Sequence, residues 1–294
     1  MARMPFTMYF AGGHGEQYLI GKPILESFWY KREAVGAMEY SKEFFLDSGA
    51  FTAFTKNVTI KAEDYAEFIH THKEKITVAS SLDAIGDAEE SYRLYKRMKE
   101  LGCDVIPVFH CREDVSFLRR YLDEGATYIA LGGMVPETNA YIGPWLDDLW
   151  SNVLTYPDGK PRVQVHAFGM TILQFIQKYP WRSVDSSSWS YGARFGAVLV
   201  QWPDKSFGWC YITERHSTRK IWGERHYATM APAYQEAVRD FLARVDSPPV
   251  DEMKEETRLI NVHNIRAFES WVTDPDAVPE IYLPIQEKGI FDLC

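Results

Sequence analysis

Three aspartates in this sequence follow short apolar runs that have the length of buried strands. They are Asp47, Asp83 and Asp185. The loops that follow the strands of a parallel barrel lie together at one end of it, so we expect the three carboxylates to be close in space. Paired carboxylates are suited to reactions at an anomeric carbon, where one attacks the carbon and the other moves a proton. The aspartates therefore predict chemistry on a glycosidic bond.

Six successive strand candidates end in polar residues or glycines. Asp and Ser side chains can bind the edge of a planar heterocycle, and a glycine pair lets backbone N–H groups approach such a ring closely. Phenylalanine and methionine side chains at the same positions could stack on its face. The predicted ligand-binding residues are Ser48, Gly49, Asp83, His110, Gly132, Gly133, Met134, His166, Phe168, Gly169 and Met170, with Phe109 as a further stacking residue.

Each of these motifs also has a purely structural explanation. Asp-Ser-Gly is a common turn sequence, Gly-Gly can simply loosen a loop, and His166 can be a hydrogen-bonded histidine of the core. A turn is a sufficient explanation for one such strand end. It is a poor explanation for six of them in succession. We therefore interpret the six strand ends as parts of one site.

The chain alternates between apolar runs and segments with helical spacing. The predicted strands are Phe6–Phe10, Glu43–Leu46, Ile76–Leu82, Asp104–Phe109, Thr127–Leu131, Val163–Phe168 and Arg182–Val184. The predicted helices are Ala62–Lys75, Ala88–Leu101, Val115–Leu122, Thr171–Lys178, Ala231–Val245 and Met253–Trp271. This alternation indicates parallel strands joined by crossover helices. Seven such units, with an eighth strand that the pattern does not show, favour an α/β fold of the (β/α)8 TIM-like barrel type.

The pattern changes after the seventh strand. Ala197–Trp202 and Gly208–Ile212 flank Pro-Asp-Lys-Ser and predict a hairpin. The Pro-Pro sequence within Val245–Val250 is the best candidate for a linker. We therefore expect a catalytic barrel domain over residues 1–245 and a C-terminal helical extension over residues 246–294 that packs on the barrel.

Composition limits the partners that the protein can bind. The 294 residues are 46% hydrophobic and carry a formal net charge of −9. That is enough apolar material for a folded core, and the acidity argues against holding nucleic acid by charge alone. A local basic strip remains possible in Trp209–His226, where tryptophans that could stack on bases alternate with cations that could hold phosphates. A solvated surface loop is the alternative. The cations are Arg215, Arg219, Lys220 and Arg225.

No cofactor or metal site is predicted. The four cysteines are scattered without a CxxC pair, and the gaps between Cys210, His216 and His226 are irregular for zinc. No phosphate-binding glycine motif is present. The first residues resemble a strand and a glycine loop more than a signal peptide. No apolar run approaches the roughly 20 residues that span a bilayer, so we expect a cytoplasmic protein without a membrane partner.

The motifs at the strand ends are similar, in order and type, to those of guanine transglycosylases. They read Asp-Ser-Gly-Ala-Phe (47–51), Ser-Leu-Asp (81–83), Val-Phe-His (108–110), Leu-Gly-Gly-Met (131–134), Phe-Gly-Met (168–170) and Val-Asp-Ser (184–186). The match extends over roughly residues 5 to 200 as spaced short motifs. The resemblance implies a barrel enzyme that exchanges guanine in a nucleic acid for a 7-deazaguanine base.

The resemblance also implies roles for both terminal aspartates of the series. Asp185 resembles the nucleophile that attacks C1′ of the target nucleoside and forms a covalent glycosyl–enzyme. Asp47 resembles the aspartate that serves as acid and base for the departing and incoming bases. The implied reaction is a double displacement with net retention and without a cofactor. Its target nucleotide must be flipped out of a duplex or be unpaired already.

The resemblance also implies roles in ligand binding. The sequence departs from the transfer-RNA enzymes at two points. Ser48 and Asp83 resemble purine-edge ligands, and Gly133 and Met134 stand where the family has backbone ligands. His110 replaces a glutamine that is usual in the transfer-RNA enzymes, which leaves the incoming base open. The C-terminal zinc site of those enzymes has no counterpart here. The sequence thus resembles the compact, phage-type enzymes that insert a base such as preQ0 into DNA, with transfer RNA as the alternative polymer.

Two other functions are consistent with the same residues. A barrel nucleosidase or glycosidase would use the aspartates with water as the acceptor. A catalytically inactive barrel could serve as a nucleic-acid-binding subunit. The presence of both Asp47 and Asp185 argues against the inactive barrel, because a binding subunit does not need the two carboxylates.

Overall fold

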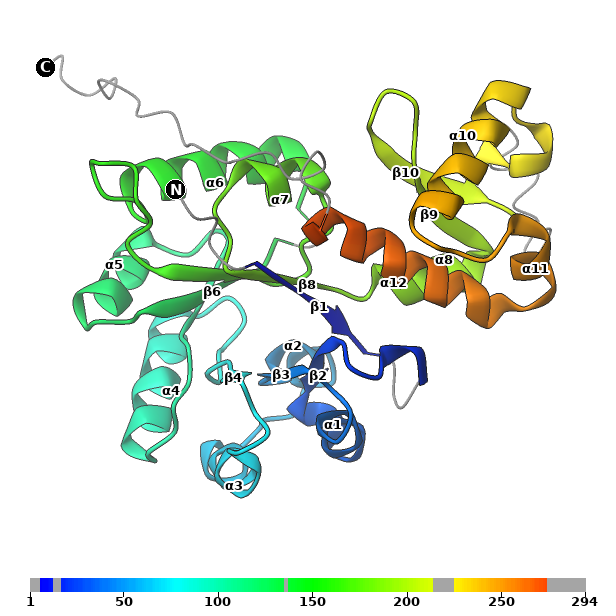
Figure 1. Cartoon of the computed structure of the whole chain (residues 1–294). Coiled ribbons are helices and arrows are strands. Elements are labelled where there is room, and N and C mark those ends of the chain that lie inside the picture. The colour runs from blue at the N-terminus through cyan, green and yellow to red at the C-terminus, as the bar shows by residue number, and fades with distance from the viewer. Residues whose placement is uncertain (1–5, 13–16, 135–136, 214–224, 274–294) are drawn as a thin grey trace, which may run out of the picture. The chain divides into compact units, whose positions relative to one another are not determined.

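In the computed structural model, which describes residues 6–12, 17–134, 137–213 and 225–273, eight parallel strands form one curled sheet. They are β1 (Thr7–Ala11), β2 (Pro23–Ser27), β3 (Glu43–Asp47), β4 (Val78–Ala79), β5 (Val108–His110), β6 (Tyr128–Gly132), β7 (Gln164–Ala167) and β8 (Ser183–Ser186). Their order is β4-β3-β2-β1-β8-β7-β6-β5. A parallel bridge between Ser80 and Ile106 links the chain beyond β4 to the chain before β5. This is the strand order of a TIM barrel, and it confirms the predicted fold class (Figure 1).

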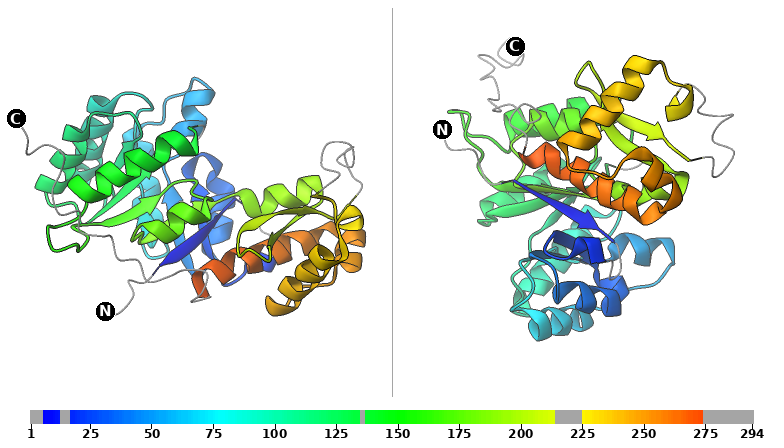
Figure 2. Two further views of the ribbon diagram at one scale, coloured as in Figure 1. Left: turned by 90° about the horizontal axis from the view of Figure 1, so that it is seen from above. Right: turned by 45° about the vertical axis from the view of Figure 1, so that its right-hand side comes forward.

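Helices alternate with these strands and lie around the outside of the sheet in all three views (Figures 1 and 2). They are α1 (Lys31–Met38), α2 (Ala50–Thr55), α3 (Ala62–His72), α4 (Ala88–Glu100), α5 (Val115–Asp123), α6 (Asn139–Asn152) and α7 (Leu173–Lys178). The Asp114 side chain accepts the Ser116 N–H and caps α5. Gly102, in the left-handed conformation, follows the end of α4.

The eighth strand is β2, which the sequence pattern does not reveal. It begins with Pro23 and contains Glu26, and both residue types are uncommon inside strands. Proline is tolerated at the first position, where its missing N–H does least harm. β2 pairs with β3 along its whole length, and this register places Ser27 beside Asp47.

The barrel interior is filled by side chains from strands that are not neighbours in the sheet. Tyr9 of β1 and Phe45 of β3 meet edge to face at 5.5 Å. Phe45 also lies 4.4 Å from the His166 ring of β7, so these contacts pass through the interior. Strand side chains alternate between faces. Asp47, two residues after Phe45, therefore faces the same interior at the C-terminal end of β3.

A second compact unit begins at Ser186. Its described residues include the strands of a hairpin and several α-helices, which are β9 (Ala197–Gln201), β10 (Phe207–Tyr211), α8 (Ser188–Phe195), α10 (Pro232–Arg244), α11 (Val250–Glu255) and α12 (Thr257–Thr273). The antiparallel pairing confirms the predicted hairpin. The predicted domain boundary at residue 245 places the hairpin and α10 with the barrel, whereas in the structure they belong to the same compact unit as the C-terminal helices. The single helix predicted over Met253–Trp271 is two helices, because Glu256 is extended.

Two buried polar side chains of α12 bind the hairpin and α8. His263 Nε2 lies 2.7 Å from the Leu199 carbonyl, and Nδ1 lies 2.7 Å from the Ser247 hydroxyl. Burial lowers the pKa of His263 to about 4, so the ring is neutral at neutral pH. The Asn264 side chain accepts the Leu199 N–H at 2.9 Å and donates to the Trp189 carbonyl at 3.1 Å. These bonds exist only when α8, β9 and α12 are assembled.

We expect Asn264→Ala to lower the free energy of unfolding of the second unit by roughly 2–4 kcal/mol. The substitution leaves the buried Leu199 N–H without its side-chain acceptor and opens a cavity. Urea unfolding followed by circular dichroism measures the loss, and hydrogen exchange at the Leu199 amide locates it. Asn139→Ala, at an exposed position, is the matched control and should stay within about 0.5 kcal/mol of the parent chain. Equal losses in both variants would contradict the role of Asn264.

Candidate active site

Asp47 is the last residue of β3, and its carboxylate is held by the backbone beside it. Its Oδ2 accepts the Gly49 N–H at 3.0 Å. The hydroxyl of Ser27, from the paired position on β2, also bonds to it. Gly49 has a φ of +80°, and a Cβ there would lie 2.7 Å from Ser27 Oγ. The glycine of Asp-Ser-Gly is therefore required both by the turn and by close packing. Ser27 is a site residue that the sequence analysis misses.

A hydrogen-bonded chain of four buried or nearly buried side chains runs from the β3 loop to the β5 loop. Ser48 Oγ donates to Asp83 Oδ1 at 2.9 Å. His110 Nε2 lies 3.0 Å from the other oxygen, Oδ2, of Asp83. On its opposite side His110 Nδ1 lies 3.0 Å from Glu113 Oε1. Glu113 also accepts the backbone N–H of His110 at 2.9 Å. The imidazole is thus held between two carboxylates.

His110 is a cation at neutral pH in this setting. Burial alone would lower the pKa of the ring, but the hydrogen bonds and charges of Asp83 and Glu113 outweigh it and raise the pKa to about 9. Both ring N–H groups then donate to carboxylates, which leaves neither nitrogen for a ligand. His110 was predicted as a ligand-binding residue, and the contacts make it the residue that orients Asp83. Glu113 was not predicted, and its i+3 spacing from His110 is its one sequence signal.

Asp185 lies near the C-terminal end of β8 and is buried. Its Oδ1 accepts the Gly169 N–H at 2.9 Å, from the loop that follows β7. His166 Nε2 lies 3.3 Å from the same oxygen. Among the described residues both neighbours contact Oδ1, so Oδ2 keeps its lone pairs.

His166 lies beside Asp185 in the barrel interior, but within the described structure its Nε2 makes no hydrogen bond. The ring is fully buried and its Nδ1 lies 2.6 Å from the Ser183 hydroxyl. It packs against Phe45 and Phe168, with ring centroids 4.4 and 4.6 Å away. A fully buried ring has no surface for a substrate. The geometry therefore matches the core-histidine explanation, with one nitrogen turned to the aspartate.

The glycine pair at the end of β6, Gly132 and Gly133, makes room for His110. A Cβ on Gly132 would lie 2.9 Å from His110 Cδ2, and one on Gly133 would lie 3.2 Å from the Cys111 nitrogen. Gly133 also has a φ of +68°. Its backbone is exposed, as the predicted contact with a ligand requires. The steric role of the pair adds a second reason for glycine at these positions.

One of the four predicted stacking side chains keeps exposed surface. Phe168 is half-buried and contacts Phe45 edge to face at 5.7 Å. Phe109, Met134 and Met170 are almost completely buried. Phe168 is therefore the ring among these four that a planar ligand could touch.

The three aspartates lie within reach of one another's charge, as their strand-end positions predict. Burial raises the pKa of Asp47 most, and the charges of Asp83 and Asp185 raise it further. Hydrogen bonds from Gly49 and Ser27 act in the opposite direction, and the resulting pKa is about 7. A carboxyl group that is half protonated near neutral pH can both donate and accept a proton in one catalytic cycle.

Exposed aromatic and basic side chains lie on the segments that follow β2 and β3, from Tyr30 into the first turn of α1 and along α2 to Lys56. The two segments touch, because a Cβ on Gly49 would lie 3.0 Å from the Trp29 nitrogen. Lys56 Nζ lies 5.7 Å from the centre of the Trp29 ring. Phe51 and Phe54 are 66% and 61% exposed. We call the exposed set the rim strip, which is Tyr30, Lys31, Arg32, Phe51, Phe54 and Lys56.

The basic strip predicted from the sequence falls mainly outside the described residues. Arg215, Arg219 and Lys220 belong to residues 214–224 and are not among them. Arg225 is described and exposed, and it lines a groove in the second unit.

Within the described ranges, no group of three or more His, Cys, Asp or Glu side chains is placed to hold a metal ion. Cys103, Cys111 and Cys210 are buried free thiols. None of the helices in those ranges has the length and hydrophobicity needed to cross a membrane.

No protein-family model matches this sequence, and no curated protein is significantly similar to it. The chemistry and geometry of the site residues therefore carry the argument for function.

We expect Glu113→Gln to lower the pKa of His110 and to reduce the free energy of unfolding at pH 7 by about 1–3 kcal/mol. The amide keeps an acceptor for the His110 backbone N–H but loses the charge. A histidine whose folded-state pKa is raised stabilises the fold fully below its unfolded pKa of about 6.5. That stabilisation is lost as the pH rises through 9, the pKa of His110 in the fold.

Urea unfolding of both proteins at pH 6, 7 and 10 checks this prediction. The difference between them should be large at pH 6 and 7 and small at pH 10. Glu89→Gln is the matched control, because Glu89 is exposed and its ion pair with Arg120 is on the surface. A loss that does not change with pH would mean that Glu113 acts through packing alone.

We expect Asp47→Asn to melt at a higher temperature than the parent chain at pH 8 and to lose that advantage at pH 5. The pKa of Asp47 is raised in the fold to about 7. Its contribution to stability is therefore lost as the pH rises from its unfolded pKa of about 4 through 7. Asparagine carries no charge at either pH. Asp104→Asn, at a fully exposed side chain, is the control. A lower melting temperature at pH 8 would show that the hydrogen bonds of the carboxylate outweigh its crowding.

Proposed function

We propose that this protein is a guanine transglycosylase that replaces guanine in DNA with a 7-deazaguanine base of the preQ0 type. The observation that carries the proposal is the difference between two carboxylates at one end of the barrel. Asp47 has a pKa of about 7 and can exchange a proton at neutral pH. The contacts of Asp185 within the described residues, with the Gly169 N–H and His166, are to Oδ1, which makes Oδ2 the oxygen suited to attack. One group is suited to move protons and the other to form a bond.

In the first step Asp185 Oδ2 attacks C1′ of a deoxyguanosine in the DNA strand. The C1′–N9 bond breaks, its electron pair leaves with guanine, and the Asp47 carboxyl supplies the proton that guanine takes up. The product is an ester between C1′ and Asp185. Asp47 is now a carboxylate and is ready to act as a base.

In the second step the incoming 7-deazaguanine loses its N9 proton to Asp47. N9 attacks C1′ from the side that guanine left, the ester bond breaks, and its electron pair returns to Asp185. Two inversions give net retention at C1′. Asp47 ends the cycle protonated, which is how the cycle began. No group is consumed, so the residues of the site complete the reaction.

Asp83 is suited to read the edge of the base. Its two oxygens are oriented by Ser48 and His110, and each has a second lone pair. Guanine and 7-deazaguanines of the preQ0 type present an imino N–H and an amino group on one edge, and a fixed carboxylate matches that pair of donors. A base without the pair would leave a buried carboxylate poorly satisfied, which is a strong basis for rejection.

The rim strip supports a polymer substrate. Lys31, Arg32 and Lys56 can neutralise phosphates, although the chain as a whole is acidic. A target nucleotide must leave the base stack before C1′ can be attacked. The exposed rings of Phe51 and Phe54 are of the kind that fill the gap a flipped nucleotide leaves. The choice of DNA over transfer RNA follows from the sequence resemblance.

Incubation with labelled preQ0 or guanine and either DNA or transfer RNA tests the proposal directly. We expect label to enter DNA while unlabelled guanine is released in equal amount. Release of guanine with abasic sites and no incorporation would identify a nucleosidase. Label that enters transfer RNA alone would refute DNA as the substrate.

We expect Asp185→Asn to reduce exchange by at least about 10³-fold, because an amide is a far poorer nucleophile than a carboxylate. Its circular dichroism spectrum should match that of the parent chain. Asp104→Asn is again the control and should keep full exchange. Mass spectrometry of enzyme quenched during turnover should find the sugar ester on the peptide with residue 185. An ester on Asp47 would mean that the two roles are reversed.

A further inference from the structure

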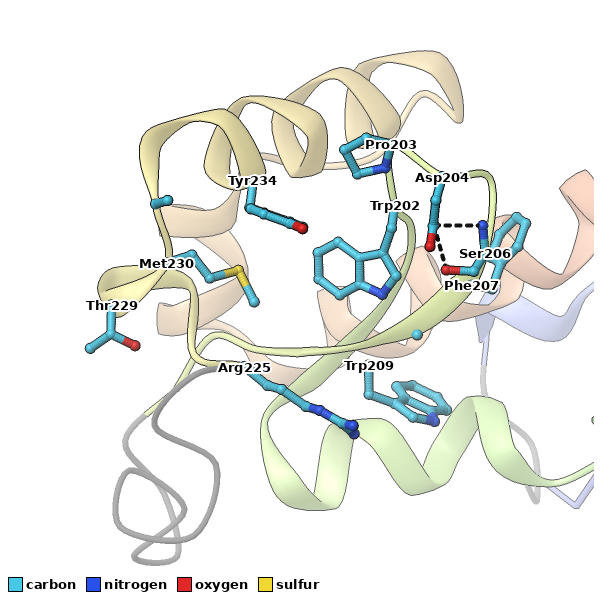
Figure 3. A pocket seen from close by; sticks show the side chains of 12 residues that line it. Trp202, Pro203, Asp204, Ser206, Phe207, Trp209, Arg225, Thr229, Met230 and Tyr234 are labelled. Carbon is cyan, nitrogen blue, oxygen red and sulfur yellow. Dashed lines mark hydrogen bonds between the residues drawn. The ribbon is translucent and has the colours of Figure 1, made fainter.

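A groove in the second unit is lined by aromatic side chains. It lies between the β9–β10 hairpin and the chain leading into α10, and its volume is about 670 Å³. Small-ligand sites commonly have about 300–1,000 Å³. The rings of Trp202, Phe207, Trp209 and Tyr234 line it (Figure 3). None of the four is buried, and Tyr234 is 50% exposed. We call this feature the hairpin groove.

The hairpin turn holds the central ring of the groove in place. The backbone N–H of Trp202 donates to the Ser206 carbonyl at 2.7 Å, which fixes the backbone that carries the ring. The Trp202 and Tyr234 rings meet edge to face, with centroids 6.0 Å apart. The indole lies against the backbone of Gly208, where a Cβ would be 2.4 Å from Trp202 Nε1. A flat ligand would therefore meet a ring that is already positioned, which lowers the entropic cost of binding.

Two opposite charges face the hairpin groove. The Asp204 carboxylate accepts the hydroxyl and the backbone N–H of Ser206, at 2.6 and 3.0 Å. These bonds lower the pKa of Asp204, so it is ionised at neutral pH. The Arg225 side chain extends toward Trp209 in Figure 3, on a different side of Trp202 from Asp204. A complementary ligand has a flat ring, an anionic group for the guanidinium and an N–H donor for the carboxylate.

We propose that the hairpin groove binds an unpaired nucleotide of single-stranded DNA. The base stacks on the Trp202 ring, the phosphate meets Arg225, and an imino or amino group of the base donates to Asp204. The inference rests on the proposed function, which supplies DNA as the polymer. It gives the enzyme a second hold on the strand, made by residues other than those of the active site.

The charges favour this occupant over a cationic one. Aromatic walls with a carboxylate also suit a methylated ammonium group, but Arg225 would repel it. Stacking is also the kind of contact that an acidic protein needs to hold a polyanion. The chain carries a net charge of −9, and stacking of a base on an aromatic ring does not depend on phosphate neutralisation.

Binding of fluorescently labelled oligothymidylate, measured by anisotropy, tests the inference with the full chain. This strand contains no guanine, so the active site has no target in it, while each thymine has an imino N–H for Asp204. Trp202→Ala should weaken binding about fivefold or more, and Trp202→Phe should weaken it less. Arg225→Ala should lower the dependence of log K on log salt by about one.

Tyr234→Ala and Tyr156→Ala form a matched pair, because the two side chains are 50% and 52% exposed and only Tyr234 lines the groove. The first should weaken binding and the second should not. Both positions are exposed, so this pair remains informative if Trp202→Ala fails to fold.

The inference would be overturned if the parent chain did not bind the oligonucleotide, or if the Tyr234→Ala and Tyr156→Ala variants bound it with equal affinity. Tighter binding of oligouridylate than of oligothymidylate would overturn the assignment to DNA. Guanine exchange is a separate measurement. Groove-dependent binding without exchange would refute the proposed chemistry and leave the groove as a binding site for DNA. Exchange without groove-dependent binding would support the proposed chemistry and refute the role of the groove.

Discussion

Four carboxylates share one end of the barrel, and the fold must limit their mutual repulsion. Burial and the charges of Asp83 and Asp185 raise the pKa of Asp47 to about 7, so near neutral pH it carries a proton about half of the time. Asp83 and Glu113 instead enclose the cation of His110, which keeps its charge up to about pH 9. A buried charge without such compensation costs several kcal/mol. Gly132 is required by the same arrangement, because any side chain there would displace His110.

The electrostatic repulsion that keeps Asp47 partly protonated also gives it the property that the proposed reaction requires. An isolated aspartate is almost fully ionised at neutral pH and is a poor acid. Crowding shifts the pKa of Asp47 to about 7, and in the proposed reaction this lets the carboxyl group give a proton to the leaving base and take one from the entering base. The crowding destabilises the ionised fold, which is the usual compromise between stability and activity at functional sites. His110 instead compensates the charge of Asp83, the carboxylate that accepts hydrogen bonds from the base in the proposed reaction.

Features of this fold that depend on the residue pattern of one strand or helix can be predicted from the sequence. Features that depend on the pairing of two elements are predicted less well. Parallel strands covered on both faces leave apolar runs, and their ends locate Asp47 and Asp185. β2 escapes prediction because Pro23 and Glu26 interrupt its run. α6 escapes because Pro144 lies inside it and ordinarily breaks a helix. Ser27 and Glu113 carry no strong signal of their own. The first becomes a site residue through the β2–β3 register, and the second through contact with His110.

The hairpin groove of the second unit also depends on contacts between elements that the sequence pattern does not reveal. The alternation of tryptophan and basic residues in Trp209–His226 predicts nucleic-acid contacts, yet Trp202 and Tyr234 lie outside that segment. They come together because the hairpin turn and α10 are neighbours, which no local pattern encodes. Salt weakens phosphate contacts steeply and stacking little. The net charge of −9 would repel a polyanion at long range. In the proposed binding mode, aromatic contacts at short range are therefore the ones able to hold a strand at physiological ionic strength.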